Sequence, residues 1–458
     1  MKKIFQYIML AVVTIVMASC TSDIEETTAT TGKNNVQLVV GEFPAFGDSQ
    51  TRAIGTPDEG KTSWAEGDEL LLEMTSETFG TNYAAFKYNG SSWELTSGEL
   101  VYLEGDPAYI PHVYYAPNYK WEAGELVLKE GKVAGTDECI EGKADITPNG
   151  EAITVKFAEA TRNYSRLRIA TMPNKPITVT INKYTPAGSS SMEWFQDIAL
   201  TSDEKGNAYL YGNFVTNSIV NVEYGGAPLA THHFYEVTGN AKSYALDATI
   251  ISANSAEEIK SAIKQEVANS KTAIRLNIAS DAGDNEFNAI REAFENVQEG
   301  TIDLTLIGCK EIPADGLNNQ SGGLEALKSI TLPDVTKIGK NALLFCVNLE
   351  EIYAPNVSAI DEGAFAECYH LRKVTLGELT DVKGDYEHGD GIFGFDSHSI
   401  ENIDLELSEK QRIMTRKLID GRYCWTPTEE PYQMSKNHTN ISFLGMRFNS
   451  ITCGMKFQ

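Results

Sequence analysis

Apolar residues return at a constant interval in the C-terminal part of the chain. Leu327-Lys-Ser-Ile-Thr-Leu is followed 22 residues later by Leu349-Glu-Glu-Ile-Tyr-Ala, and after the same interval by Leu371-Arg-Lys-Val-Thr-Leu. A unit this short cannot bury its own apolar side, so neighbouring units must stack, and a fixed period in the low twenties is typical of a solenoid. The positions that we expect to form the repeat core are Leu327, Ile330, Leu332, Ile338, Cys346, Leu349, Ile352, Ile360, Phe365, Cys368, Leu371 and Val374.

A helical spacing of apolar residues precedes the repeats. Ser255 and Glu258 have the spacing of a capping box, in which each side chain satisfies a free N–H group at the start of a helix. The apolar residues that follow predict a helix over 256–268 that covers the first edge of the solenoid. A similar spacing that includes Phe287 and Ile290 predicts a second helix between two early strands.

The pattern before the repeats is that of short strands. Segments such as 36–40, 152–157 and 176–181 are rich in β-branched residues and bounded by turn residues. Asn89-Gly90 lies between two further strand-like segments and predicts a tight type I′ hairpin turn, because both residues accept positive φ angles. A series of strands without a long helix favours a β-sandwich or Greek-key fold.

The first 35 residues have the pattern of a targeting segment and a linker. Lys2 and Lys3 precede an apolar run that is too short to span a bilayer, which predicts a signal peptide over 1–19. The small residues before Cys20 resemble the lipobox of bacterial lipoproteins, which implies cleavage before Cys20 and acylation of its thiol and new amino group. The alternative is an ordinary signal peptide followed by a chance cysteine. Residues 20–35 have almost no apolar side chains, which predicts a disordered tether.

Several short motifs resemble the N-terminal domain of fimbrillin-family proteins. They are Thr51-Arg52-Ala53, the segment 62–70 with its tryptophan, and Val113-Tyr-Tyr-Ala-Pro117, and the match spans residues 36–172. The resemblance implies transthyretin-like β-sandwiches in outer-membrane lipoproteins, some of which are pilins. Residues 173–253 have the position of a second such domain but contain no diagnostic motif.

The same resemblance makes Arg52 a possible processing site. In some fimbrillins a trypsin-like protease cuts after an arginine at this place, which would free residues 36–44 and leave a groove for a donor strand from the next subunit. The alternative is that Arg52 is an ordinary loop residue, because a bulky C-terminal domain would hinder chain growth. Acidic residues close behind Cys20 resemble the surface-export signal of Bacteroidetes-type lipoproteins, or else belong to a solvated linker.

The repeats themselves resemble the BspA-like leucine-rich repeat. Leu332-Pro333, Ile338-Gly339, Ala364-Phe365 and the two repeat cysteines lie at the offsets of its consensus, and we assign residues 254–458 to this domain and its caps. The chain is therefore expected to be mostly β, with two β-sandwich (transthyretin/fimbrillin-like) domains followed by an α/β leucine-rich-repeat solenoid with a helical N-terminal cap. A wide solenoid surface usually binds other molecules.

Composition narrows the choice of partners and chemistry. The 458 residues carry 38 basic and 64 acidic side chains, for a net charge of −26. We expect no nucleic-acid partner, because binding nucleic acid requires a basic surface, and we expect contact with a membrane through the lipid anchor only. None of the seven cysteines is part of a C-x-x-C motif, so we expect no metal. The sequence contains no catalytic motif, so we expect no cofactor and no enzyme activity.

An acidic insert interrupts the third repeat. It lengthens that repeat by seven residues if Ile400 takes the position otherwise expected at 393. Oxygen ligands at alternate positions can hold Ca²⁺, although the spacing fits no EF-hand. The interpretation that we favour is a solvated loop on one face of the array. The weak metal candidates are Asp381, Asp385, Glu387 and Asp390.

The C-terminal segment is predicted to close the array. We expect a helix over 409–418, then an aromatic segment, then a last strand over 441–451. Tyr423, Trp425 and Tyr432 are the clustered aromatic residues of this domain, and a glycan-binding platform would have to use them.

These observations together predict a lipid-anchored adhesin or binding protein of the outer membrane that faces the cell exterior. Its repeats would bind a host or bacterial surface protein or a glycan. One alternative is a minor or tip subunit of a fimbria, joined to other fimbrial subunits by donor-strand addition after cleavage near Arg52. Another alternative is an accessory glycan-binding lipoprotein. We also expect a fragment of residues 254–458 to fold by itself.

Overall fold

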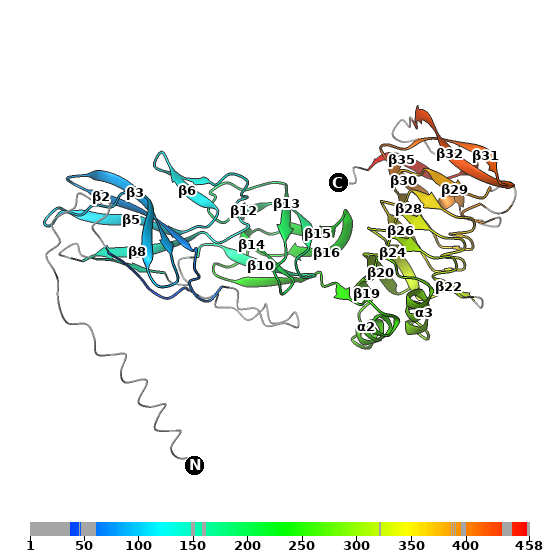
Figure 1. Ribbon diagram of the computed structural model, residues 1–458, viewed down its shortest axis with the longest axis horizontal. Coiled ribbons are helices and arrows are strands. Elements are labelled where there is room, and N and C mark those ends of the chain that lie inside the picture. Colours follow the sequence, from blue (N-terminus) through cyan, green and yellow to red (C-terminus); the bar gives the residue numbers. More distant parts are fainter. Residues whose placement is uncertain are drawn as a thin grey trace, which may run out of the picture.

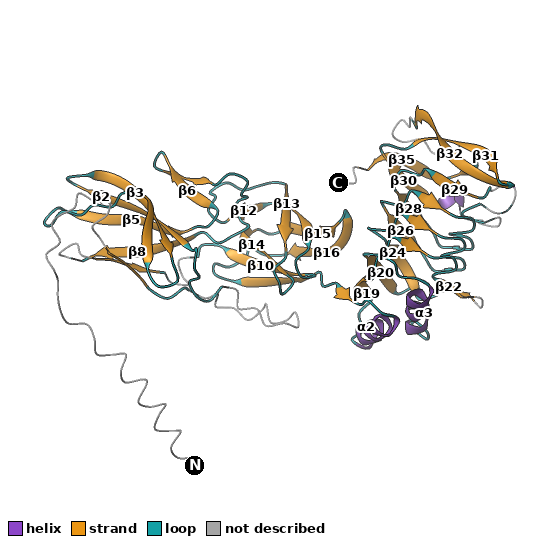
Figure 2. Cartoon of the chain, in the orientation of Figure 1, coloured by secondary structure: helices purple, strands orange, loops and turns teal. Residues whose placement is uncertain are grey.

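The chain folds into three units that follow one another along the sequence (Figure 1). The structure is a computed structural model, and it describes residues 37–44, 46, 61–147, 152–157, 162–319, 322–385, 387, 389, 391–394, 400–432 and 442–455. Cys20, Arg52 and Asp390 lie outside the described residues. The described part is mostly β, as predicted, and strands dominate all three units (Figure 2).

The first unit is built on one sheet of seven strands in the order β1-β9-β8-β5-β2-β3-β4. β1 is the edge strand in this order, and it pairs with β9 in parallel. One face of the sheet covers an apolar core, and the short pair β6–β7 packs on the other face. The bounds are β1 Gln37–Val40, β2 Glu69–Ser76, β3 Gly80–Tyr88, β4 Trp93–Gly98, β5 Ala108–Tyr115, β6 Tyr119–Glu122, β7 Glu125–Leu128, β8 Ile140–Ile146 and β9 Ala152–Lys156.

The predicted hairpin at Asn89-Gly90 exists, but its turn is not type I′. Tyr88 pairs with Trp93, so the loop between β3 and β4 has four residues rather than two. Gly90 has a φ of 94°, whereas Asn89 does not have a positive φ. The Asn89 side chain instead accepts the N–H groups of Ser91 and Ser92 at 2.9 and 2.8 Å, and this local bonding stabilises the longer loop.

The second unit consists of two four-stranded sheets, β12-β14-β10-β17 and β13-β11-β15-β16, whose apolar side chains share one core. β10 pairs with β14 and β17, so this pair of sheets begins at Ser165 and includes residues that the sequence motifs had assigned to the first domain. The bounds are β10 Ser165–Ala170, β11 Pro176–Ile181, β12 Tyr184–Pro186, β13 Gln196–Thr201, β14 Asn207–Phe214, β15 Ser218–Tyr224, β16 Ala227–Phe234 and β17 Ser243–Asp247.

The third unit is a stack of repeats with two parallel ladders of strands. The longer ladder is an eight-stranded sheet in the order β18-β19-β20-β24-β26-β28-β30-β35. Its strands are β18 Ile251–Ser252, β19 Ala273–Asn277, β20 Ile302–Ile307, β24 Leu327–Thr331, β26 Glu351–Ala354, β28 Lys373–Leu376, β30 Asp404–Ser408 and β35 Ser450–Met455. The shorter ladder contains β21 Glu311–Ile312, β25 Lys337–Ile338, β27 Ala359–Ile360 and β29 Asp381–Lys383, followed by β32 Arg422–Pro431 and β31 Arg412–Ile419.

The period of 22 residues appears directly as strand register. Ile330 pairs with Ile352, and Ile352 pairs with Val374. On the outside of the repeats, the hydroxyl of Ser358 donates to the carbonyl of Thr336, and that of Thr380 donates to the carbonyl of Ser358. Stacking therefore aligns equivalent residues, which buries the apolar ones and lets the polar ones bond to the neighbouring repeat.

The insert in the third repeat is longer than the sequence suggested. Glu351 pairs with Lys373, 22 positions later, whereas Lys373 pairs with Asp404, 31 positions later. The insert therefore adds nine residues rather than seven. Ile400 is buried at the start of the short helix η4 Ile400–Asn402, one turn before the strand that continues the ladder.

Two helices lie at the N-terminal end of the stack (Figure 2). They are α2 Ala256–Ala268, which has the predicted bounds, and α3 Asp284–Ala293. Ser255 is the N-cap of α2, and its side chain accepts the backbone N–H of Glu258. No helix in the described ranges is long and apolar enough to cross a membrane.

The predicted helix over 409–418 is wrong. Residues 412–419 instead form β31, which makes a hairpin with β32 around Asp420-Gly421. Ile419 pairs with Arg422, and both loop residues have positive φ angles of 50° and 78°, as in a type I′ turn. The Asp-Gly pair was the signal for this hairpin. The predicted last strand is replaced by two short strands, β33 Ser442–Phe443 and β34 Met446–Arg447, and by β35.

Candidate functional site

The outward side of the eight-stranded sheet carries two rows of mostly polar side chains, which we call the repeat face. Alternate residues of a strand point to opposite sides of a sheet, so the residues between the buried apolar positions face outward. Strand register aligns them from one repeat to the next. One row is Ala273, Asp303, Ser329, Glu351, Lys373 and Asp404, and the other is Arg275, Thr305, Thr331, Tyr353, Thr375 and Glu406.

Hydrogen bonds between neighbouring strands hold part of the repeat face in place. The hydroxyl of Ser329 donates to Asp303 Oδ1 at 2.6 Å. At the far end of the face, Glu406 accepts the hydroxyl of Thr375 at 2.7 Å, and its other oxygen lies 3.2 Å from Lys373 Nζ. These bonds orient the carboxylates before any ligand binds, and such pre-organisation lowers the entropy lost on binding.

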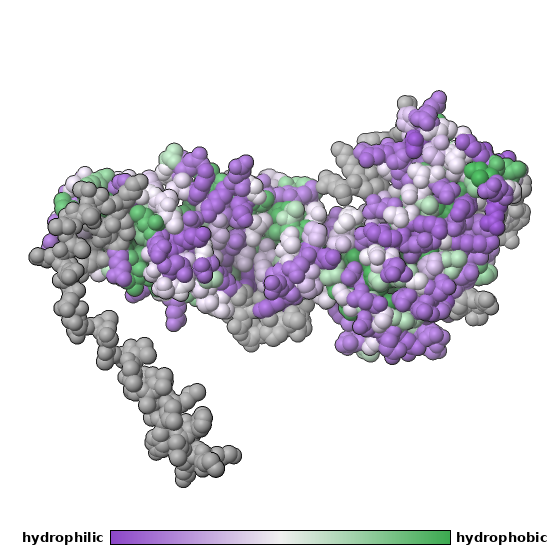
Figure 3. All heavy atoms as spheres, viewed as in Figure 1, coloured by the Kyte–Doolittle hydropathy of each residue, from purple (hydrophilic) through white to green (hydrophobic). Residues whose placement is uncertain are grey.

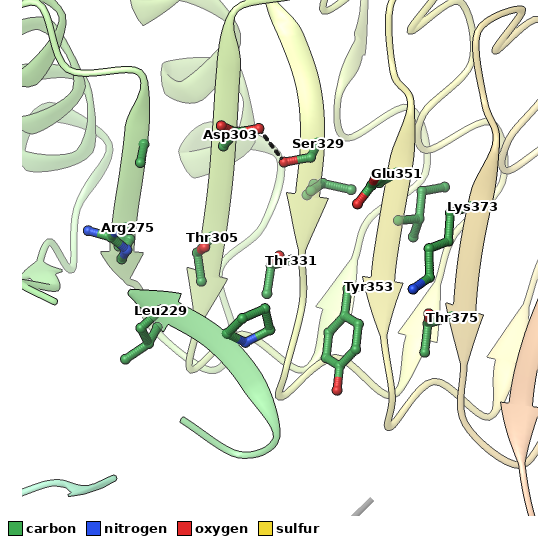
Figure 4. A pocket seen from close by; sticks show the side chains of 14 residues that line it. Leu229, Arg275, Asp303, Thr305, Ser329, Thr331, Glu351, Tyr353, Lys373 and Thr375 are labelled. Carbon is green, nitrogen blue, oxygen red and sulfur yellow. Dashed lines mark hydrogen bonds between the residues drawn. The ribbon is translucent and has the colours of Figure 1, made fainter. Parts of the chain in front are cut away.

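A hairpin of the second unit lies against the repeat face (Figure 4). It is formed by β15 and β16, with Gly225 and Gly226 in the turn at φ angles of 55° and 81°. The hydroxyl of Tyr353 donates to the carbonyl of Gly226 at 2.5 Å. Burial, followed by the charges of Glu223 and Glu406, raises the pKa of Tyr353 to about 12, so its hydroxyl remains a donor at neutral pH.

A cavity of about 400 Å³ separates the hairpin from the repeat face. Pro228 and Leu229 of β16 form its apolar side, and residues of five neighbouring repeat strands, β19 to β28, form the other. Figure 4 shows Arg275 at one end of this cavity, Tyr353 near the other, and Thr305 and Thr331 between them. This volume falls in the range of sites for small ligands.

Two further contacts join the second unit to the repeats. Ile307 at the end of β20 is fully buried in the core of the second unit. Lys271 Nζ lies 3.1 Å from Asp247 Oδ2 across the same junction. The junction therefore combines a shared apolar core, an ion pair and the hydrogen bond of Tyr353, which together position the hairpin over the repeat face.

The acidic insert places an arginine between two of the metal candidates. Arg416 Nη1 lies 2.6 Å from Asp385 Oδ2 and 2.7 Å from Glu387 Oε2. Hydrogen bonding to Glu387 is the main cause of a raised Arg416 pKa. Asp381 lies on β29 and is exposed. Within the described ranges, no three acidic, histidine or cysteine side chains are grouped so that they could hold a metal ion.

The three candidate binding aromatics do not form an exposed platform. Trp425 and Tyr432 are partly buried and pack against the repeat core. The ring of Tyr432 meets Phe443 edge to face, with centroids 5.4 Å apart, and burial raises the pKa of Tyr432 to about 12. The Arg416 guanidinium lies over the ring of Tyr423 at 5.0 Å. A platform needs open ring faces, which these contacts reduce.

The twelve residues expected in the repeat core are all at most 5% exposed. Burial raises the pKa of Cys346 to about 12 and that of Cys368 well above its usual value, so both thiols stay protonated at neutral pH. Neither takes part in a disulfide. They behave as small apolar residues of the core.

Sequence reasoning did not identify the repeat face by residue. Thr331, Tyr353 and Thr375 stand at the same offset, between two buried apolar positions of successive repeats. Their alignment was readable from the period of 22 residues. Their proximity to Pro228 and Leu229 was not, because it depends on how the second unit packs against the repeats.

The comparison with protein families agrees with the repeat pattern. Residues 319–410 match the family model for the BspA-type leucine-rich repeat region, in six copies. A search of the curated proteins finds no match to this chain. The match includes β24, β26, β28 and β30, which carry most of the repeat face. The chain therefore contains a leucine-rich-repeat region of the BspA type, a kind of repeat that suggests a protein-binding or adhesin-like role at a surface.

Proposed function

We propose that the protein is a lipid-anchored adhesin of the outer membrane that binds a surface protein or a glycan through the repeat face. The observation that carries the proposal is the repeat face itself: polar side chains are aligned over successive parallel strands, and the cavity next to the hairpin opens among them. Extended faces of stacked repeats are commonly binding surfaces. Figure 3 shows that the visible surface of the repeat unit is largely hydrophilic, which suits reversible contact with a hydrated partner.

The first two units are proposed to be fimbrillin-like β-sandwiches that act as a stalk. They precede the repeats along the chain (Figure 1), and Cys20, which would carry the lipid, precedes both units in the sequence. Acylation is tested by growth with a labelled fatty acid, and Cys20→Ala should abolish incorporation of the label. Exposure at the cell surface is tested by adding protease to intact cells. Labelling of the Cys20→Ala chain, or complete protection from protease, would contradict this part of the proposal.

The binding function is tested with a bulky substitution at the centre of the repeat face. Thr331→Arg places a long charged side chain in the cavity. The matched control is Ala359→Arg, which introduces the same side chain on the shorter ladder. Binding of the chain without its first 20 residues is measured on panels of immobilised surface proteins and glycans. We expect Thr331→Arg to abolish a binding signal that Ala359→Arg preserves. Equal effects of both substitutions, or no binding on either panel, would refute the proposal.

A fimbrial subunit is the second candidate, and the position of β1 favours it. β1 is an edge strand that pairs with β9, so its removal would expose one edge of the first sheet. A strand from another subunit could then pair with β9. Unboiled outer-membrane fractions separated on a gel test this candidate. A ladder of multiples without the N-terminal tether would support cleavage near Arg52, and a single lipidated band would exclude it.

A further inference from the structure

The cavity next to the hairpin is formed by two separate parts of the chain that are held at a defined distance. β16 contributes Pro228 and Leu229, and the repeat face contributes the rest of the lining. The bond from Tyr353 to Gly226 joins the two sides. Gly226 has a φ of 81°, a left-handed conformation that favours glycine, and this conformation shapes the turn that meets Tyr353. The cavity is therefore a feature of the packed units and not of either unit alone.

Two polar groups in the cavity lack partners within the described part of the protein. Thr305 is only 7% exposed, lines the cavity, and its hydroxyl makes no hydrogen bond to another described residue. Arg275 is half-buried, lines the same cavity and forms no ion pair with any described carboxylate. Burial lowers the pKa of Arg275, although the charges of Asp247 and Asp303 oppose this effect. A ligand in the cavity could therefore bond to both groups without displacing a bond within the described part of the protein.

The remaining lining supplies donors and acceptors rather than a continuous apolar wall. Hydroxyls of Thr305 and Thr331 and the carboxylate of Glu351 stand on three adjacent strands, and neighbouring strands are about 4.8 Å apart. Pro228 and Leu229 and the ring of Tyr353 are the apolar surfaces. The lining thus combines an apolar surface with several hydrogen-bonding groups, as small-molecule sites commonly do. This combination matches a ligand that has several hydroxyl groups, an apolar ring face and one negative charge.

We propose that the cavity binds a carboxylated sugar residue, such as a uronic acid or a sialic acid. Its carboxylate would pair with the Arg275 guanidinium, which is suited to bidentate binding of a carboxylate. The sugar hydroxyls bond to Thr305, Thr331 and Glu351, and the ring lies between the hairpin and Tyr353. The inference rests on the proposed binding function and names the class of ligand. An acidic peptide could pair with Arg275, but it would leave most of the hydroxyl groups of the face without partners.

The test uses the chain without its lipid-bearing N-terminal residues. Isothermal titration calorimetry measures the dissociation constant of each of four defined probes. The probes are glucuronic acid and N-acetylneuraminic acid, with glucose as the neutral sugar and a short glutamate-containing peptide as the acidic peptide. Arg275→Gln removes the charge, and Thr305→Val removes the hydroxyl while keeping the shape. The matched control is Arg372→Gln, because Arg372 is exposed on the same array and pairs with Glu350 outside the cavity.

We expect at least one of the acidic sugars to bind and glucose to bind much more weakly. Arg275→Gln should weaken binding at least about tenfold, and Arg372→Gln should change it less than twofold. Binding of glucose as tight as that of the acids, unchanged affinity in Arg275→Gln, binding of the peptide alone, or no binding of any probe would each overturn the inference. If surface binding is lost in Thr331→Arg but not in Arg275→Gln, the adhesin function stands and the proposed ligand class is wrong.

Discussion

Glu138 holds a buried arginine at the junction between the first and second units. Arg162 is fully buried, and its Nε and Nη2 atoms donate to the two oxygens of Glu138 at 3.0 and 2.9 Å. Nη2 also donates to the carbonyl of Pro44 at 2.7 Å, and the guanidinium lies 4.1 Å from the ring centre of Phe46. The pair therefore fastens the segment that follows the N-terminal strand. Burial alone would lower the pKa of Arg162, but the bonds and charge of Glu138 outweigh it and raise that pKa.

We predict that Glu138→Gln lowers the free energy of unfolding of this junction by about 3 kcal/mol. Removing one partner of a buried pair typically costs about 3–5 kcal/mol, because the remaining charge has no counter-charge. Glutamine preserves one acceptor oxygen and the side-chain volume, which places the expected loss at the lower end. Arg162→Met combined with Glu138→Leu should cost less than Glu138→Gln, because no buried charge remains in the double variant.

Urea unfolding followed by tryptophan fluorescence measures the effect. Trp64 contacts Phe43 in the first unit, with ring centres 4.9 Å apart, so its emission reports on the fastened segment. The control is Glu141→Gln, the same chemical change in the same unit, where Glu141 is exposed and pairs with His112 at 2.7 Å. We expect Glu141→Gln to change the free energy of unfolding by no more than about 0.5 kcal/mol. If both variants unfold at the same urea concentration, Glu138 does not balance the charge of Arg162 as we infer.

Three more predictions concern the repeats. Ile352→Ala should lower the free energy of unfolding of the repeat unit by about 2–5 kcal/mol in urea, because it leaves a cavity at a fully packed position; a loss below 1 kcal/mol would contradict the packing. Burial raises the pKa of Cys346 to about 12, so its thiol should not react with a thiol reagent at pH 8 until the protein is unfolded. Rapid labelling of Cys346 in the native chain would disprove its burial. A fragment of residues 249–458 should melt at a higher temperature than 254–458, because the shorter fragment lacks β18 and leaves the edge of β19 unpaired; equal melting temperatures would show that β18 adds no stability.

The hydrophobic period by itself determined the repeat architecture. Leu327, Leu349 and Leu371 recur every 22 residues, and stacking such short units is the way to bury them. The register of the parallel ladder followed from that pattern. The start of α2 was also readable, because Ser255 accepts the N–H of Glu258, three residues later, while the Glu258 side chain accepts the N–H of Asn254 just before the helix.

Local patterns were less decisive where two conformations compete. The segment 412–419 contains both helix-forming and strand-forming residues. It forms a strand because it pairs with β32 through the turn at Asp420-Gly421. The length of the insert in the third repeat was misjudged for a related reason. Ile400 is buried like a repeat residue, but the ladder resumes at Asp404, and hydrogen-bonded register rather than burial shows which residue takes the repeat position.

Only the tertiary structure decided where the candidate ligand site lies. Tyr353 and Gly226 are 127 residues apart in the chain, yet their hydrogen bond closes one side of the cavity. The exposed offsets of the repeats show that Arg275, Thr305 and Tyr353 point outward, but not that a hairpin faces them. That arrangement depends on the packing of one unit against another, and no periodic pattern within either unit encodes it, because each local pattern reports only on which residues its own unit buries.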